Sequence, residues 1–156
     1  MAFGTGSHPT TRLCLEWLER SVRPGMSLLD YGCGSGVLAI AAGRLGASEV
    51  VGVDIDPQAV VVARGNAEAN GVAARFQESA DRLSGQFDIV VANILANPLR
   101  VLAPALCGHL RAGGMLALSG ILVEQADELI EAYAPCLSLT VVDSRDGWVC
   151  LAGSRN

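Results

Sequence analysis

The feature that most constrains the fold is the run SLLDYGCGSGVLAIAAGRL at residues 27–45. Ser27–Tyr31 is a short apolar segment with one acid, Gly32-Cys-Gly34-Ser-Gly36 follows it, and an apolar stretch then continues to Gly46. Glycines between a strand and a helix permit positive φ and let the backbone approach a ligand. The helix N-terminus presents its amide groups to the same place. The run therefore predicts a strand, a ligand-binding loop and a helix.

The same alternation continues along the chain. Apolar, β-branched segments predict further strands at 50–54, 74–77, 87–92 and 115–119. Helical spacing and turn signals predict a first helix capped by Thr10 or Thr11. Further helices are predicted over 37–45, 57–70, 98–110 and 123–134. The segments 137–142 and 148–152, joined by 143–147, predict a closing hairpin. We expect one α/β domain, residues 1–156, with a doubly wound, mostly parallel, seven-stranded Rossmann-like sheet and a C-terminal antiparallel hairpin.

Composition excludes several classes of protein. No uncharged apolar run approaches the ~20 residues of a membrane span, and the N-terminus lacks a secretory signal, so we expect a cytoplasmic protein without membrane contact. The net charge is −5 and all eleven basic residues are arginine, which disfavours nucleic-acid binding and is compatible with a basic protein substrate. The five cysteines are scattered without a C-x-x-C pair, which predicts reduced, mostly buried thiols and no metal site. We expect a monomer.

The acid before the glycine loop separates two kinds of cofactor. Gly34-Ser-Gly36-Val-Leu-Ala39 satisfies the weaker form of the dinucleotide fingerprint, which leaves an NAD-dependent oxidoreductase as an alternative. Asp30, however, stands two residues before Gly32. A carboxylate at this place suits S-adenosylmethionine, which carries an ammonium and a sulfonium and no pyrophosphate. We therefore expect Asp30, Gly32, Gly34 and Gly36 to bind S-adenosylmethionine.

A second acid follows about 20 residues after the glycines. Asp54 ends the second predicted strand, where a carboxylate accepts hydrogen bonds from both ribose hydroxyls. The alternative is that Asp54 caps the next helix, although Asp56, directly before Pro57, is better placed for that. Ile55 is expected to pack on the adenine face. The adenine edge is expected near Ser79-Ala80, so Ala80 is a further candidate.

Asn93 is a primary amide at the end of an apolar strand. With the first and fourth strands adjacent in a doubly wound sheet, Asn93 lies at the same edge as the glycine loop. Its oxygen can accept a hydrogen bond from an incoming amine and aim the nitrogen at the activated methyl, so we predict Asn93 as the catalytic residue. The alternative is that it caps the next helix or fixes a loop.

Five segments together resemble one enzyme family. FGTGSHPTT at 3–11, LLDYGCGSGVLAIAA at 28–42, GVDIDPQAV at 52–60, VVANILANPL at 90–99 and GWVCLAGSR at 147–155 resemble the PrmA-type methyltransferases of bacterial ribosomal protein L-eleven. The resemblance implies transfer of methyl groups from S-adenosylmethionine to amino groups of that protein, at lysine side chains and the N-terminus. It implies cofactor contacts from Thr11, Gly32, Asp54 and Asn93. A hydroxyl and free amides at the start of the first helix suit the methionine carboxylate.

The family also carries a substrate-recognition domain before the FGTG box, whereas this chain starts at Met1. We therefore expect a catalytic domain alone. An alternative keeps the cofactor and changes the acceptor, because Asn93-Ile-Leu-Ala is similar to the N-P-P-Y run of glutamine-amide and nucleic-acid base methyltransferases. This chain lacks the two prolines and the aromatic residue of that run.

Overall fold

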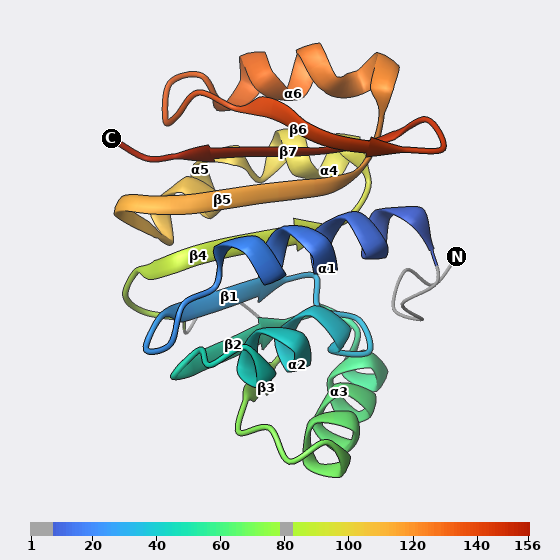
Figure 1. Ribbon diagram of the computed structural model, residues 1–156, viewed down its shortest axis with the longest axis vertical. Helices are drawn as coiled ribbons and strands as arrows, with labels where there is room; N and C mark the ends of the chain where they lie inside the picture. The colour runs from blue at the N-terminus through green and yellow to red at the C-terminus, as the bar shows by residue number, and fades with distance from the viewer. Residues whose placement is uncertain (1–7, 79–82) are drawn as a thin grey trace.

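The computed structural model describes residues 8–78 and 83–156. Its strands and helices alternate along most of the chain (Figure 1). The strands are β1 (Ser27–Tyr31), β2 (Glu49–Val53), β3 (Arg75–Gln77), β4 (Phe87–Asn93), β5 (Leu110–Leu122), β6 (Thr140–Arg145) and β7 (Trp148–Ser154). The helices are α1 (Pro9–Ser21), α2 (Val37–Arg44), α3 (Pro57–Ala69), α4 (Ala96–Val101), α5 (Ala103–Gly108) and α6 (Ala126–Tyr133), and a 3-10 turn, η2 (Val123–Gln125), leads into α6.

The described strands form one seven-stranded sheet in the order β3-β2-β1-β4-β5-β7-β6. β3, β2, β1, β4 and β5 run parallel, and β7 is antiparallel to both β5 and β6. The chain winds outward from β1 in one direction and from β4 in the other. This confirms the doubly wound sheet and the closing hairpin, and it places the change of winding between β1 and β4.

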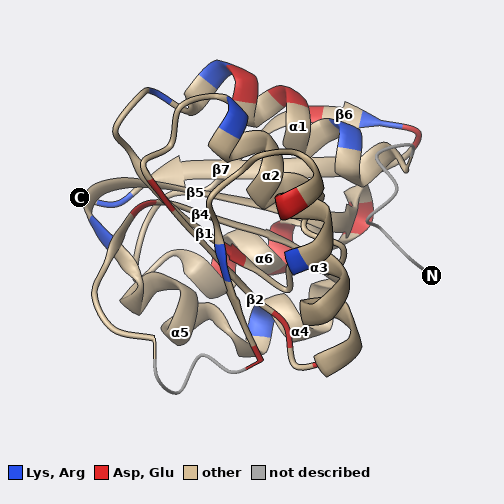
Figure 2. Cartoon of the chain, turned by 90° about the horizontal axis from the view of Figure 1, so that it is seen from below, with Lys and Arg blue, Asp and Glu red and all other residues tan. Residues whose placement is uncertain are grey.

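Helices cover both faces of the sheet. Figure 2 shows α1 and α2 on one side and α4 and α5 on the other, with acidic and basic residues interspersed over the surface. Successive side chains of a strand point to opposite faces, and the two cores follow this rule. Leu28 of β1 packs in the core beneath α1 and α2, whereas its neighbour Leu29 packs in the core beneath α4, α5 and α6.

The prediction of a single helix over 98–110 is wrong, because the structure has two short helices there. The structure contains α4 and α5, separated at Leu102. Pro104 has no N–H to donate to the carbonyl of Arg100, so one helix cannot continue through this turn. Pro98 is tolerated because it lies in the first turn of α4, where the N–H groups have no helical acceptor.

The predicted caps and turns need three smaller corrections. α1 is capped by His8, whose side chain accepts from Thr10 N–H, and not by Thr10 or Thr11. β5 begins at Leu110, before the strand predicted at 115–119, and it runs through Ala112-Gly-Gly114 with a register shift at its start. The hairpin turn is the pair Asp146-Gly147, both at positive φ, as a two-residue turn requires, so β6 is displaced toward the C-terminus.

No helix among the described residues has the length and apolar character needed to cross a membrane.

Candidate active site

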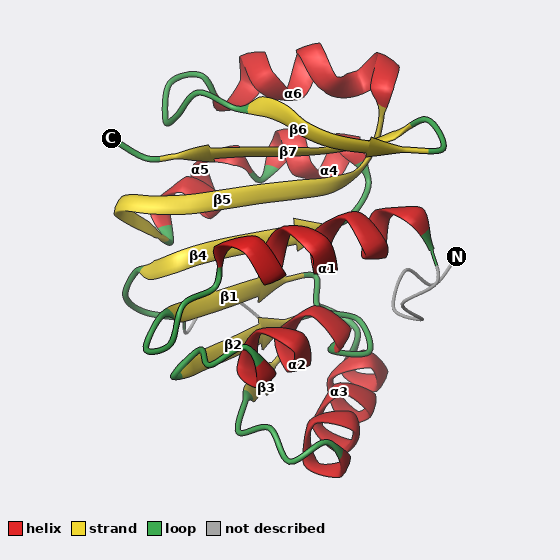
Figure 3. Cartoon of the chain, viewed as in Figure 1, coloured by secondary structure: helices red, strands yellow, loops and turns green. Residues whose placement is uncertain are grey.

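The parallel strands end at one edge of the sheet, and three predicted site segments meet there. Figure 3 shows the arrowheads of β1, β2 and β4 pointing to this edge. Asp30 pairs with Val91 across the β1–β4 ladder, so the residue two positions further, Gly32, comes level with Asn93. Tyr31 pairs with Val53, the residue before Asp54. The register therefore brings together the glycine loop, Asp54 and Asn93, and we call this place the carboxyl edge.

The glycine loop has the backbone conformation that its sequence predicts. Gly32, Gly34 and Gly36 have φ angles of 82°, 52° and 88°. Residues other than glycine adopt such positive φ angles only with strain. A Cβ at Gly32 would lie 2.6 Å from Cγ2 of Ile94. The loop is held by the Gly32 and Cys33 N–H groups, which donate to the Val53 carbonyl at 2.7 and 2.9 Å.

Asp30 lies under the loop and is buried. The Ala39 N–H, in the first turn of α2, donates to its carboxyl group, which replaces the side-chain cap that Gly36 cannot supply. The other oxygen, Oδ2, is buried without a hydrogen-bond partner. Burial raises the pKa of Asp30 to about 7, opposed by the Ala39 N–H and reinforced by the charge of Asp54. The contact of Asp30 with a cofactor stays a prediction.

Asp54 joins the loops that follow β1 and β2. Its Oδ2 accepts from the Gly34 N–H at 2.9 Å, and its Oδ1 accepts from the Asp56 N–H at 3.0 Å. Asp56 is the residue that caps α3, through a bond from the Gln58 N–H to its side chain. The capping alternative for Asp54 is therefore excluded. The Asp54 carboxylate is fixed against the glycine loop and remains partly exposed.

Asn93 is buried, with 7% of its surface exposed. Its Nδ2 donates to Oγ1 of Thr11 at 3.4 Å, so α1 and β4 meet at this amide. Its Oδ1 is buried and has no hydrogen-bond partner. Asn93 caps no helix, because α4 begins three residues later and its cap position is Leu95. An acceptor with no partner at a buried position is unusual, and it is the atom that the sequence assigned to an incoming amine.

The remaining predicted residues have different positions. Thr11 is fully buried in the first turn of α1. Ile55 is 90% exposed, an unusual place for an isoleucine and one that leaves its side chain open to a ligand. Ala80 lies outside the described residues. The structure also has a cavity of about 340 Å³ just beyond the end of β4, lined among others by Leu95, Leu122 and Trp148, which the sequence did not predict.

His8 and Trp148 were also missed as neighbours. The ring of His8 meets the indole of Trp148 edge to face, with centroids 5.4 Å apart. Two residues from opposite ends of the sequence, His8 and Trp148, thus meet at the carboxyl edge. Both residues belong to segments of the resemblance, but neither segment has a spacing or periodicity that predicts the contact.

Comparison with known proteins decides the family. The sequence model described as "Ribosomal protein L11 methyltransferase (PrmA)" matches residues 1–156. The chain belongs to this family. Among the curated members of the PrmA family, the ribosomal protein L11 methyltransferase of Dechloromonas aromatica is 69% identical over 99% of the chain, and that of Ralstonia pickettii is 61% identical. The chain spans about half the length of these relatives, 52% in each case.

Solved structures agree with the fold and with the family. The ribosomal protein L11 methylase of Lactobacillus delbrueckii subsp. bulgaricus has a TM-score of 0.91 and 36% identity, covering 97% of this chain and 81% of its own. A 16S rRNA methyltransferase of T. Thermophilus in complex with AdoMet and guanosine has a TM-score of 0.82 and 26% identity, covering 99% of this chain and 45% of its own. The PrmA-type resemblance is thereby confirmed.

Proposed function

We propose that this domain binds S-adenosylmethionine at the carboxyl edge and transfers its methyl group to amino groups of ribosomal protein L11. The acceptors we propose are lysine side chains and the N-terminal amine. The names of the PrmA relatives support the substrate, and the AdoMet complex of the related rRNA methyltransferase supports the cofactor. A ribosomal substrate also agrees with the cytoplasmic location expected from the sequence. The monomeric state and the absence of nucleic-acid binding stay predictions.

The residues at the carboxyl edge fit S-adenosylmethionine. Gly34 has open space where a Cβ would otherwise stand, so its backbone is open to a ligand, whereas Gly36 is buried and leaves room for Ala63 and Phe76. Asp54 is fixed by two N–H groups and keeps lone pairs that accept from ribose hydroxyls. Ile55 offers an exposed apolar surface to the adenine ring. No dinucleotide is needed to explain any of these features.

The single observation that carries the proposal is the buried, unpaired Oδ1 of Asn93. S-adenosylmethionine supplies a methyl group on a positively charged sulfur, which is already a good leaving group. The protein must then hold the amine in line with that methyl, and such alignment supplies most of the rate enhancement in displacement reactions. Nδ2 of Asn93 donates to the Thr11 hydroxyl, whereas the acceptor capacity of Oδ1 is unused. An amine N–H that donates to Oδ1 is oriented for attack.

The amine must also be neutral. A lysine side chain has a pKa near 10.4 in water, and transfer from water into a closed apolar site lowers that pKa. The cavity just beyond the end of β4 contributes to such surroundings, because the apolar side chains of Leu95, Leu122 and Trp148 line it together with Asn97 and Gln125. The hydrocarbon stem of a lysine suits these apolar side chains.

Calorimetric titration of the protein with S-adenosylmethionine and with NAD tests the cofactor. We expect binding of S-adenosylmethionine and none of NAD; the reverse result would overturn the proposal. Asp54→Ala should weaken the binding about 10- to 100-fold, because a bond to a charged acceptor contributes about 1.5–3 kcal/mol. Asp56→Ala is the matched control: it removes the α3 cap, costs about 1 kcal/mol of stability and should leave the affinity unchanged.

Incubation of the protein with labelled cofactor and ribosomal protein L11 tests the acceptor. We expect label on lysine side chains or on the N-terminal amine, located by peptide mass spectrometry. Label on glutamine amides would favour the alternative acceptor class. Label on RNA in a ribosomal mixture, with none on protein, would contradict the proposed substrate while leaving the cofactor intact.

A further inference from the structure

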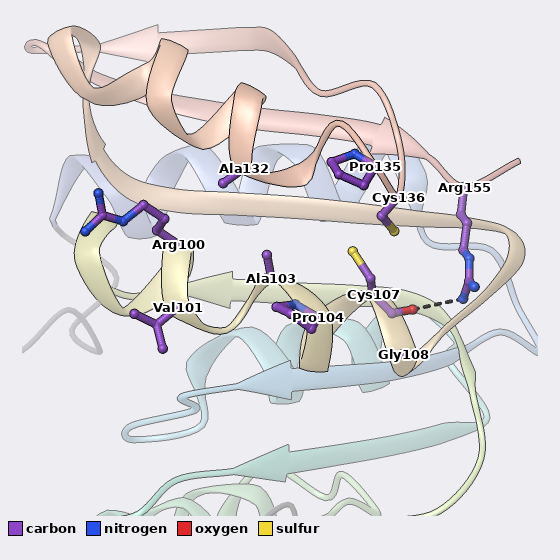
Figure 4. Close-up of a pocket in the computed structure, with 10 residues that line it drawn as sticks. All are labelled: Arg100, Val101, Ala103, Pro104, Cys107, Gly108, Ala132, Pro135, Cys136 and Arg155. Carbon is purple, nitrogen blue, oxygen red and sulfur yellow. Dashed lines mark hydrogen bonds between the residues drawn. The ribbon is translucent and has the colours of Figure 1, made fainter.

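A second cavity lies at the opposite edge of the sheet. It has a volume of about 690 Å³ and is lined by residues of α4, α5, the end of α6 and the C-terminal strand segment (Figure 4). Its place follows from the strand register, because β5 begins at Leu110, opposite Phe87 at the start of β4. We call this place the amino edge. None of the residues assigned to the methyl-transfer site lines this cavity.

Two cysteines from separate elements meet in this cavity. Cys107 lies in α5, and Cys136 lies in the segment between α6 and β6. Figure 4 shows their sulfur atoms pointing toward each other, and Cys136 is close enough to contribute to the raised pKa of Cys107. Both residues are partly exposed, so a small molecule in the cavity reaches either sulfur.

A fixed support holds Cys107 in place. The Arg155 guanidinium donates to the Cys107 carbonyl at 2.9 Å and also to the Leu110 carbonyl. Cys136 is held by its own N–H, which donates to the Tyr133 carbonyl at 2.9 Å. The pair is therefore built from two anchored backbones and is not a chance encounter of mobile side chains.

The other three cysteines differ from this pair. Cys14 and Cys150 also lie near each other. Burial raises the pKa of Cys14, and the electrostatic effect of the neighbouring Cys150 raises it further. Both are 0% exposed, and Cys33 is 5% exposed. These three pack as small hydrophobes, which agrees with the mostly buried thiols that the sequence predicts, whereas Cys107 and Cys136 are partly exposed. Accessibility separates the two pairs.

We propose that Cys107 and Cys136 are a thiol pair that forms a reversible disulfide with the oxidised form of a low-molecular-weight thiol. One cysteine loses its proton and attacks the small disulfide, which forms a mixed disulfide and releases one small thiol. The second cysteine then attacks the protein sulfur of the mixed disulfide and releases the second small thiol. Two cysteine thiols are oxidised, and one small disulfide is reduced to two thiols.

The bond would connect α5 to the segment after α6 and close the chain between residues 107 and 136. Burial, with the neighbouring Cys136, raises the pKa of Cys107 to about 12, and the Arg155 charge opposes this. Cys107 is therefore a thiol at neutral pH, and oxidation of the pair should accelerate as the pH rises. Because the bond forms at the amino edge, it constrains the helical layer without occupying the methyl-transfer site.

The test is incubation of the folded protein with oxidised glutathione at pH 8.5, followed by acid quenching, denaturation, alkylation and peptide mass spectrometry. We expect a Cys107–Cys136 cross-linked peptide, reversed by dithiothreitol, with Cys14, Cys33 and Cys150 alkylated. Cys107→Ser and Cys136→Ser are matched controls. Each should instead retain a stable mixed disulfide on the remaining cysteine, because the second attack is no longer possible.

Three results would overturn the proposal. Glutathione on both cysteines without a cross-link would show that the sulfurs cannot approach bonding distance. A Cys14–Cys150 cross-link would show that accessibility does not select the pair. No loss of thiols in the folded protein, under conditions in which the urea-unfolded protein is oxidised, would show that the cavity does not admit the small disulfide. All three readouts are independent of cofactor binding and of methyl transfer.

Discussion

The two edges of the sheet differ in whether their polar side chains have hydrogen-bond partners. At the amino edge, the Asp88 carboxylate accepts from both the N–H and the hydroxyl of Ser27 and forms an ion pair with Arg111. At the carboxyl edge, Oδ2 of Asp30 and Oδ1 of Asn93 are buried without partners. Among the residues that the structure describes, these are the two buried side-chain atoms left in that condition.

This difference separates a structural edge from a functional one. A buried polar atom without a partner costs about 1–3 kcal/mol, so two such atoms lower the stability of the domain substantially. The Asp88 network adds stability because both carboxylate oxygens have partners within the protein. The carboxyl edge loses stability in the free protein and keeps an acceptor ready for a substrate. Strain and unpaired groups of this kind concentrate at functional sites.

The largest expected effect is on the pH dependence of stability, and it depends on Asp30. Burial raises the pKa of Asp30 to about 7 in the folded state, against about 3.9 in the unfolded chain. Between these values the folded protein holds a proton that the unfolded chain has released, so the contribution of Asp30 to the free energy of unfolding falls as the pH rises. Three pKa units correspond to about 4 kcal/mol. Asp30→Asn should remove this loss, measured by urea unfolding from pH 4 to pH 8.

At the amino edge, Asp88 should give the free energy of unfolding the opposite pH dependence. Burial alone would raise the pKa of Asp88, but the Ser27 N–H and Arg111 lower it below its usual value. Its stabilisation is present above the unfolded pKa and is lost as the pH falls through the folded pKa. Asp88→Asn should therefore destabilise the protein at pH 7 and matter less in acid. If the two variants have parallel pH profiles, the proposed difference between the edges does not exist.

Most of the fold was predictable because it depends on local signals. The apolar runs and the glycine loop gave β1 with its observed bounds and placed β2 and β4 within one residue. The missed features arise where one residue changes the local conformation. Pro104 divides α4 from α5, and Asp146-Gly147 moves the hairpin turn along the chain. In both places a helical or extended pattern continues across the break, so periodicity alone does not reveal it.

The site was predictable to the extent that strand order fixes it. Once β1 and β4 are neighbours, Gly32 and Asn93 must share an edge, and the sequence indicated both. The contact of Thr11 with Asn93 was not predictable from spacing, because α1 can pack at several positions on the sheet. The same holds for His8 and Trp148. The amide orientation that leaves Oδ1 of Asn93 unpaired depends on these tertiary contacts.

The next largest effect concerns Asn93. Asn93→Ala should reduce methyl transfer about 100-fold, the scale of losing one well-placed hydrogen bond in a transition state. The free energy of unfolding should change little, because the substitution also removes an unpaired buried acceptor. The measurement combines initial rates at saturating S-adenosylmethionine with urea unfolding of the same preparation. A normal rate would remove Asn93 from the mechanism.

Ser119 is the matched control for Asn93. It lies directly opposite Asn93 in the β4–β5 ladder and is fully buried, but its hydroxyl donates to the Val149 carbonyl at 3.1 Å. Ser119→Ala should cost about 1 kcal/mol of stability and leave the rate unchanged. An equal loss of activity in both variants would mean that any disturbance of this layer impairs catalysis, and that Oδ1 of Asn93 has no special part.

The smallest expected effect compares two glycines that both have positive φ. Gly25, before β1 at the amino edge, has a φ of 89° and open space where a Cβ would stand, whereas a Cβ at Gly32 would meet Ile94. Gly25→Ala should cost about 1 kcal/mol, the penalty of the left-handed conformation. Gly32→Ala should cost about 2–3 kcal/mol, because overpacking is added. It should also slow methyl transfer, because Ile94 is covalently bonded to Asn93.

The double variant Gly32→Ala/Ile94→Ala distinguishes the two contributions. Removal of the Ile94 branch opens the space that the new Cβ needs, so the stability and rate losses should be less than additive, while the φ penalty remains. Urea unfolding and initial rates of the two single variants and the double variant complete the cycle. Additive losses would mean that the Gly32–Ile94 contact does not connect the glycine loop to the catalytic amide. The carboxyl edge would then consist of two sites that act independently.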